Sequence, residues 1–128
     1  MNRNIIWKLI ILYGAIAVII GAFGAHGLKP HLSEDQYNSF LTGSRYHFFH
    51  TIIAAIVMII PSKFRTWISS WTPVLFLIGI LFFSGSIYIL ACRDMIGMNV
   101  SWLGPITPIG GLILIAGWLS MLSIKTPA

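Results

Sequence analysis

Charged side chains are scarce in this sequence. They make up 9% of its 128 residues, whereas 57% of the residues are hydrophobic. A soluble domain carries roughly 25% charged residues, so this composition excludes a small soluble fold. The deficit comes from long uncharged runs, which predict helices that span a membrane.

Acidic residues are the scarcest charged group. The chain has three of them against eight Lys and Arg residues, which gives a formal net charge of +5. The cations stand singly or in close pairs between apolar runs and form no basic face, so we expect no nucleic-acid partner. In a membrane protein, cations placed in this way indicate topology.

Cysteine is nearly absent as well. Cys92 is the only one, which excludes an intrachain disulfide and a cysteine-based metal site. The three carboxylates, Glu34, Asp35 and Asp94, all fall in predicted loops. No set of nucleophile, base and acid is visible, and no phosphate-binding loop. We therefore expect neither an enzyme nor a resident cofactor.

Four apolar runs are long enough to cross a bilayer, which takes about 20 residues. The first covers residues 5–27 and is longer than the apolar core of a signal peptide, about 7–15 residues, so we expect it to remain as a helix. The others cover residues 44–60, 73–92 and 102–123. We predict an all-α integral membrane bundle of four transmembrane helices, forming a single domain over residues 1–128.

The segment between the first two spans carries helix signals of its own. Pro30 ends the first helix, and Ser33 with Gln36 forms a capping box at the start of the next one. Apolar residues at helical spacing then predict a short amphipathic helix over residues 33–41, lying at the membrane surface. We expect Gly43 to provide the bend into the second span.

Four spans place both chain ends on the same side of the membrane. That side has five cations and no acidic residue: Arg3, Lys8, Lys63, Arg65 and Lys125. The opposite side has three cations, Lys29, Arg45 and Arg93, and all three acidic residues. Because cytoplasmic loops carry the excess of Lys and Arg, we predict a multi-pass protein of the cell (inner, cytoplasmic) membrane with both termini in the cytoplasm.

Small residues recur along one face of the first span. Ala17, Gly21 and Ala25 follow every fourth position, and Gly14 lies close to the same stripe. Lipid offers no hydrophobic drive for helices to associate, so small residues serve by letting two backbones approach closely. We predict that this stripe packs against a helix of the same chain or of a neighbour, and we expect a homo-oligomer or a membrane-protein partner.

Polar side chains of all four predicted spans reach a similar depth. With a rise of about 1.5 Å per residue, His26 lies roughly 27 Å and His47 roughly 24 Å from the cytoplasmic end. In a core about 30 Å thick these positions lie in the outer half. We expect His26, His47 and Tyr88 to meet there. The full candidate layer comprises His26, His47, His50, Ser84, Ser86, Tyr88 and Thr107.

Three hypotheses fit this polar layer. It could be structural, with side chains that bond across closely spaced helices. It could bind something small, such as a lipid headgroup, a quinone or an ion. It could also bind a metal or haem through His47 and His50, which share a helix face, but no cysteine or membrane carboxylate joins them. For an anionic headgroup at the outer interface, the candidate contacts are Arg45, Arg93 and Trp102.

Four short motifs follow one another along the chain. They are GAFGAHGL at residues 21–28, RYHFFHT at 45–51, SGSIYIL at 84–90 and GPITPIGG at 104–111, the last followed by GW. In this order and spacing they resemble the small four-helix membrane proteins related to bacterial YgdD and YwdK. The resemblance covers nearly the whole chain and implies an integral membrane protein of four helices. It implies no reaction, cofactor or substrate.

The sequence therefore predicts a small multi-pass membrane protein with a structural or accessory role, in contact with membrane lipids. The alternative is a transporter or channel for a small ligand or an ion. Four short helices leave little room for a pore, so this alternative requires an oligomer.

Overall fold

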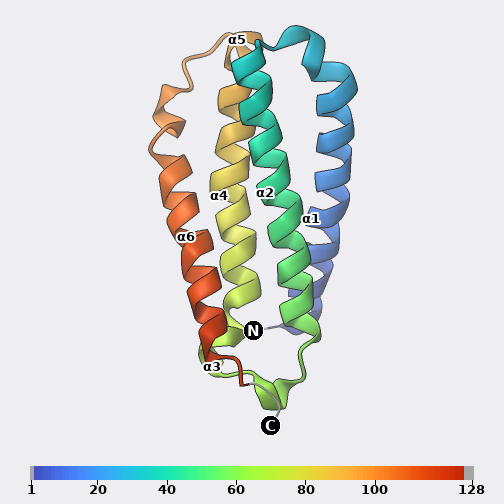
Figure 1. Cartoon of the computed structure of the whole chain (residues 1–128), viewed down its shortest axis with the longest axis vertical. Coiled ribbons are helices and arrows are strands. Elements are labelled where there is room, and N and C mark those ends of the chain that lie inside the picture. Colours follow the sequence, from blue (N-terminus) through green and yellow to red (C-terminus); the bar gives the residue numbers. More distant parts are fainter. Residues whose placement is uncertain (1, 126–128) are drawn as a thin grey trace.

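The computed structural model describes residues 2–125, and all regular structure in that range is helical. Figure 1 shows four long helices running up and down: α1 (Arg3–Phe23), α2 (Glu34–Ile59), α4 (Thr72–Ala91) and α6 (Ile106–Ser120). Shorter segments connect or extend them: η1 (Gly24–Leu28), η2 (Lys29–His31), η3 (Ser62–Phe64), α3 (Trp67–Ser70), α5 (Arg93–Ile96), η4 (Ser101–Leu103) and η5 (Met121–Ser123).

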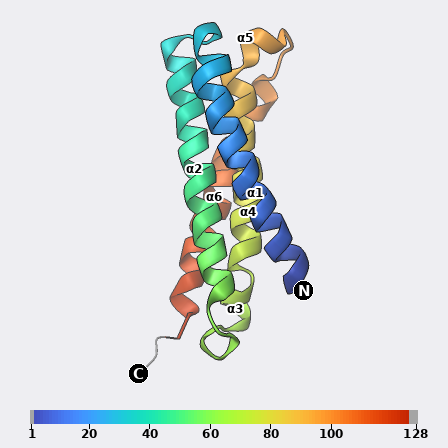
Figure 2. The same ribbon diagram turned by 90° about the vertical axis from the view of Figure 1, so that its right-hand side faces the viewer.

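The four long helices form an open row. The central helix α4 packs extensively against α6 on one side and α2 on the other, whereas α1 packs against α2 and touches α4 only slightly. The first turn of α1 and the last turn of α6 lie at the same end as α3, with α5 at the opposite end (Figures 1 and 2). An even number of antiparallel helices brings the start of α1 and the end of α6 to the same end of the bundle in this way.

Three segments are long and apolar enough to cross a membrane: Arg3–His31, Thr72–Ala91 and Ser101–Ser123. The predicted all-α membrane fold is confirmed by these helices. The remaining long helix, α2, is 26 residues long but more polar. It lies beside α4 along the bundle and completes the set of four (Figure 1).

The short amphipathic helix predicted over residues 33–41 is not a separate element. The capping box forms as expected, with Ser33 Oγ accepting from the backbone N–H of Gln36 at 3.3 Å, but α2 then continues through Gly43 without interruption. A Cβ on Gly43 would lie 3.0 Å from Ile87 and 3.1 Å from Tyr88 of α4. This glycine therefore lets α2 approach α4, and the sequence signal for a bend was a signal for close packing.

The small-residue stripe of α1 packs within the same chain. A Cβ on Gly14 would meet Thr51, and one on Gly21 would meet Ser44, both on α2. Ala25 is exposed, and Gly24 takes its place against the ring of Phe40. The reason is helix periodicity, because a step of four residues drifts by about 40° from the starting face each time.

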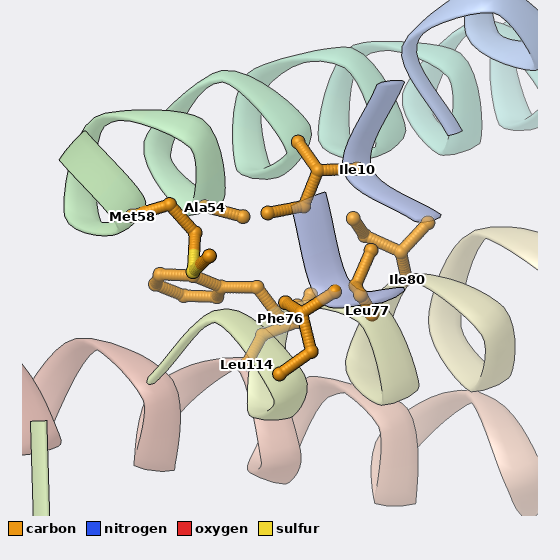
Figure 3. Packing of buried hydrophobic residues seen from close by; sticks show 8 residues of the cluster. Ile10, Ala54, Met58, Phe76, Leu77, Ile80 and Leu114 are labelled. Atoms are coloured by element: carbon orange, nitrogen blue, oxygen red, sulfur yellow. The ribbon is translucent and has the colours of Figure 1, made fainter. Parts of the chain in front are cut away.

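The main apolar core lies in the half of the bundle nearer α3 and draws on all four long helices. Phe76 of α4 is fully buried at its centre, and Ile10, Met58 and Leu114 converge on the same region from α1, α2 and α6 (Figure 3). A smaller cluster of Leu28, Phe40 and Ala91 closes the other end. Within lipid, such clusters stabilise the fold through close van der Waals packing.

Glycines bring α6 against α4. A Cβ added to Gly110 would overlap the backbone of Phe83, and one on Gly117 would lie 2.7 Å from the ring of Phe76. Gly79 of α4 meets Leu114 of α6 in the same manner. The two helices therefore approach at distances that no larger residue allows at these positions.

We expect Gly110→Ala to lower the thermal stability of the purified protein, because its methyl group meets rigid backbone of α4. Overpacking of this kind costs about 1–3 kcal/mol. Gly111→Ala is the matched control, since its Cβ would lie 3.6 Å from the Phe83 ring, an ordinary contact. Equal melting temperatures for the two variants in detergent would contradict the close contact at Gly110.

Candidate functional site

The buried His47 of α2 pairs with Tyr88 of α4. Its Nδ1 lies 3.2 Å from the Tyr88 hydroxyl, and the ring of Tyr13 on α1 stands edge-on to the imidazole with 5.8 Å between ring centroids. The other ring nitrogen, Nε2, has no hydrogen-bond partner among the described residues. The backbone carbonyl of Tyr13 faces this histidine but does not complete a hydrogen bond.

A second polar atom without a partner lies close to His47. Ser84 of α4 is fully buried, and its Oγ makes no hydrogen bond within the described part of the chain. Both side chains line one cavity of about 200 Å³, together with Tyr13 and Tyr88. The rest of its wall is aliphatic apart from Gly85. Buried polar groups are nearly always hydrogen-bonded, so two unpaired ones beside one cavity single out this place as the candidate site, and neither atom is itself exposed to the cavity.

His50 lies one turn along α2 and has a different environment. Its Nδ1 donates to the Tyr46 carbonyl at 2.8 Å, and its Nε2 accepts from the indole N–H of Trp118 on α6 at 3.1 Å. This pair of bonds fixes a neutral imidazole with the proton on Nδ1. Both nitrogens are used, so His50 holds α2 to α6 and has no free lone pair to offer a ligand.

Ser86 and Thr107 form a third contact, between α4 and α6. Their hydroxyl oxygens lie 2.7 Å apart, and Ser86 also donates to the Phe83 carbonyl at 3.0 Å. The polar residues expected in one layer thus divide into three groups on different sides of α4. His47, Ser84 and Tyr88 line one cavity together, whereas His50 and Ser86 each line a different hollow.

The structure does not bring His26 to this group. His26 is exposed on η1 and makes no hydrogen bond to any residue in the described range. The α1 side chain that faces His47 is Tyr13, which precedes His26 by 13 residues, roughly 20 Å of helix. Depths counted separately for each helix do not show which residues of α1 and α2 lie side by side. The short connection between the two helices fixes that pairing. Tyr13 itself was missed, although it is the only polar side chain in the middle of the first span.

The three candidate headgroup contacts do not form one site. Arg93 donates to the Leu90 carbonyl at 3.1 Å, and its Nε lies 3.9 Å from Asp94 Oδ1. Trp102 is exposed at the same end of the bundle. The carboxylate of Asp94 also accepts from the side-chain amide of Gln36 at 2.6 Å, which ties the start of α2 to α5. Arg45 stands apart on the exposed face of α2. Among residues 2–125, no three His, Cys, Asp or Glu side chains gather as a metal-binding group.

A sequence profile of the DUF423 family, described as a protein of unknown function, matches residues 20–111. The chain belongs to this family. It is 40% identical over 123 residues to the UPF0382 membrane protein of Staphylococcus haemolyticus, covering 93% of this chain and 95% of the relative. It is 38% identical to the UPF0382 membrane protein YwdK of Bacillus subtilis, covering 88% of this chain and 91% of the relative.

The similarity extends to a eukaryote. The UPF0382 membrane protein C1782.12c of Schizosaccharomyces pombe is 36% identical over 118 residues, which cover 91% of this chain and 98% of the relative. No solved structure matches the chain. The resemblance seen in the motifs is confirmed, and the protein is a membrane protein of this family. His47, Ser84 and Tyr88 fall within the matched residues, whereas Tyr13 lies before them.

We expect Trp118→Phe to destabilise the protein, because it leaves His50 Nε2 buried without its donor. A buried group left unsatisfied costs about 1–3 kcal/mol. Trp102→Phe is the control, since Trp102 is 66% exposed and should tolerate the change within about 0.5 kcal/mol. If both variants unfold at the temperature of the unmodified protein, the bond between Trp118 and His50 does not contribute.

Proposed function

We propose that this protein is a non-catalytic accessory protein of the cell membrane that binds anionic lipid through Arg45. The observation that carries the proposal is a guanidinium group on the lipid-facing side of α2. Arg45 is exposed, and it has neither a hydrogen bond nor an ion pair to any residue that the structure describes. It precedes Ile59, at the inner end of α2, by 14 positions, roughly 21 Å of helix.

This depth decides what Arg45 can bind. In a hydrocarbon core about 30 Å thick, the residue lies in the outer half, where an unpaired charge is costly. The long side chain can extend toward the interface while its methylene groups remain in the apolar region. A lipid phosphate is the anion available at that interface, and guanidinium matches its geometry with two parallel hydrogen bonds.

The surface around Arg45 suits the rest of a lipid molecule. A shallow hollow of about 780 Å³ surrounds the residue and is lined by Tyr46, Phe48, Phe49 and Ile52. These side chains are all between 43% and 52% exposed. An acyl chain that follows the headgroup at Arg45 would cover this apolar surface, which supports a lipid over a soluble anion as the ligand.

We expect Arg45→Gln to weaken the binding of phosphatidylglycerol to the purified protein, measured by native mass spectrometry in detergent, by roughly tenfold, since a hydrogen bond to a charged group contributes about 1.5–3 kcal/mol. Arg45→Lys should keep part of the affinity, because it keeps the charge but loses the paired geometry. Phosphatidylcholine should show no such dependence on Arg45.

Lys29→Gln is the matched control, since it removes an exposed cation at the same end of the bundle. It should leave phosphatidylglycerol binding within a factor of two. Equal losses for Lys29→Gln and Arg45→Gln would mean that general surface charge attracts the lipid, and the proposed site would be rejected.

Orientation in the membrane is part of this proposal. The end of the bundle that holds α3 also holds Arg3, which donates to the Met58 carbonyl at 2.8 Å, and the two cations Lys63 and Arg65. The positive-inside rule supports placing this end in the cytoplasm. The exposed flanks of α1 and α6 support association with a second copy or another membrane protein, and an oligomeric transporter remains the alternative function.

Cysteine labelling tests the orientation. In a Cys92→Ser background, Lys125→Cys should react with a membrane-impermeant maleimide only after the membrane is permeabilised, whereas Met98→Cys should react in intact cells. Both positions are exposed, Met98 by 71%. Labelling of Lys125→Cys in intact cells, with Met98→Cys protected, would reverse the proposed topology.

A further inference from the structure

The short helix α3 buries a polar side chain and exposes apolar ones. Ser69 is fully buried, whereas Trp67 is 76%, Trp71 48% and Ile68 45% exposed. A helix that borders water shows the opposite arrangement, because its apolar side chains are directed to the core. The outer side of α3 is therefore adapted to an apolar environment. An exposed apolar patch of this kind marks contact with a membrane or with another protein.

Hydrogen bonds fix α3 in this orientation. The backbone N–H of Ser69 donates to Thr66 Oγ1 at 3.2 Å, and that of Thr66 donates to Ser69 Oγ at 2.9 Å, which closes a capping box. Thr66 Oγ1 also lies 2.7 Å from Ser123 Oγ of η5. Turning the helix over to bury Trp67 would break these bonds, so the exposure of the tryptophans is built into the fold.

The position of α3 decides between a membrane and a soluble partner. Trp71 ends α3 and is also the N-cap residue of α4, so no spacer separates α3 from a helix that is apolar enough to span. At its other end, Thr66 is bonded to Ser123, the last residue of another such segment. The helix is thus held where the spans leave the hydrocarbon, which is the interface at which tryptophan is enriched. Its neighbours at that level are phospholipids.

Three cations accompany the exposed apolar side of α3. Lys63 and Arg65 lie on the segment just before the helix, and Lys125 is joined to that segment by its backbone N–H, which donates to the Phe64 carbonyl at 2.8 Å. All three Asp and Glu side chains of the chain belong to the opposite end of the bundle (Figure 1). No Asp or Glu therefore neutralises the positive charge at the α3 end.

This charge selects among the lipids at the interface. Lys63 and Lys125 are exposed. Arg65 Nε is buried without a partner in the described structure, whereas its two Nη groups are not enclosed and are free to meet a ligand. Guanidinium binds phosphate through two parallel hydrogen bonds, and basic residues beside a membrane attract anionic lipids. A lipid with a net negative charge is favoured over a zwitterionic one.

We propose that the α3 end of the bundle is a second lipid-binding surface, specific for an anionic phospholipid. Trp67, Ile68 and Trp71 lie among the glycerol groups and the upper parts of the acyl chains, and Lys63, Arg65 and Lys125 surround the phosphate. This surface is separate from Arg45, which lies roughly 21 Å along α2 from the end that adjoins η3. It is independent of which side of the membrane the α3 end occupies.

Binding of phosphatidylglycerol to the purified full-length protein, measured by native mass spectrometry in detergent, tests the charge selection. All variants carry Arg45→Gln, so that the site on α2 does not contribute. Lys63→Gln and Arg65→Gln should each weaken binding about fivefold, the contribution of one basic residue beside an anionic surface. Phosphatidylcholine binding should not change.

Lys29→Gln is the matched control in the same background. Lys29 Nζ lies 5.5 Å from the Tyr37 ring centroid, much as Lys63 Nζ lies 4.9 Å from that of Phe64, but Lys29 is at the opposite end of the bundle. It should leave phosphatidylglycerol binding within a factor of two. Equal losses for Lys29→Gln and Lys63→Gln, or no loss for Lys63→Gln, would overturn the proposal. Because Lys63 is exposed, this comparison holds even if Arg65→Gln does not fold.

The depth of α3 is tested separately, by spin labels in nanodiscs of phosphatidylglycerol and phosphatidylcholine. In a Cys92→Ser background, a label on Trp67→Cys should collide more often with oxygen, which concentrates in lipid, than with a water-soluble nickel chelate. A label on Ser62→Cys should show the reverse, because Ser62 is exposed on η3, which extends beyond α3 (Figure 1). Equal access of the chelate to both labels would show that α3 faces water, and would overturn the proposal in favour of a soluble protein partner.

The two lipid sites fail independently. The site on α2 is rejected if Arg45→Gln alone leaves phosphatidylglycerol binding unchanged. The α3 surface is rejected by the further variants in that background and by the depth of the label at position 67, neither of which involves Arg45.

Discussion

The close approach of α4 to its two neighbours is the contact on which the structure depends. Gly43 allows it on the α2 side, and Gly79, Gly110 and Gly117 allow it on the α6 side. In lipid, helices gain nothing by hiding apolar surface from water, so association depends on how closely the backbones can pack. These glycines set the spacing of α2, α4 and α6, and the core around Phe76 forms within it.

The polar side chains of α2 depend on that spacing in two different ways. Between α2 and α6 the helices are close enough for Trp118 to donate to His50, and both nitrogens of that imidazole are satisfied. His47 reaches Tyr88 of α4 with one nitrogen, and its other nitrogen is buried without a partner among the described residues. Two histidines three positions apart therefore differ, because one is hydrogen-bonded through both ring nitrogens and the other through only one.

The position of α1 explains the cavity beside His47. Its small residues seat it on α2, where Gly14 and Gly21 meet Thr51 and Ser44, and nothing comparable draws it onto α4. The bundle is thus tight on the α6 side and open on the α1 side. The exposed Arg45 lies on α2, outside the cavity that His47 lines.

The sequence by itself determined the class of the protein and the four long helices, since long uncharged runs, Pro30 and the capping box at Ser33 act locally. It missed by ten residues where the second predicted span begins as a helix, because it expected a separate helix before Gly43. It also indicated His47, Ser84 and Tyr88 through depth alone. Only the tertiary structure decided which polar residues meet. The pairing of α1 with α2 placed Tyr13 beside His47 and left His26 exposed, and packing against α4 turned Gly43 from an expected bend into a point of contact. Such outcomes depend on relative rotation and sliding of helices, which local sequence signals do not specify.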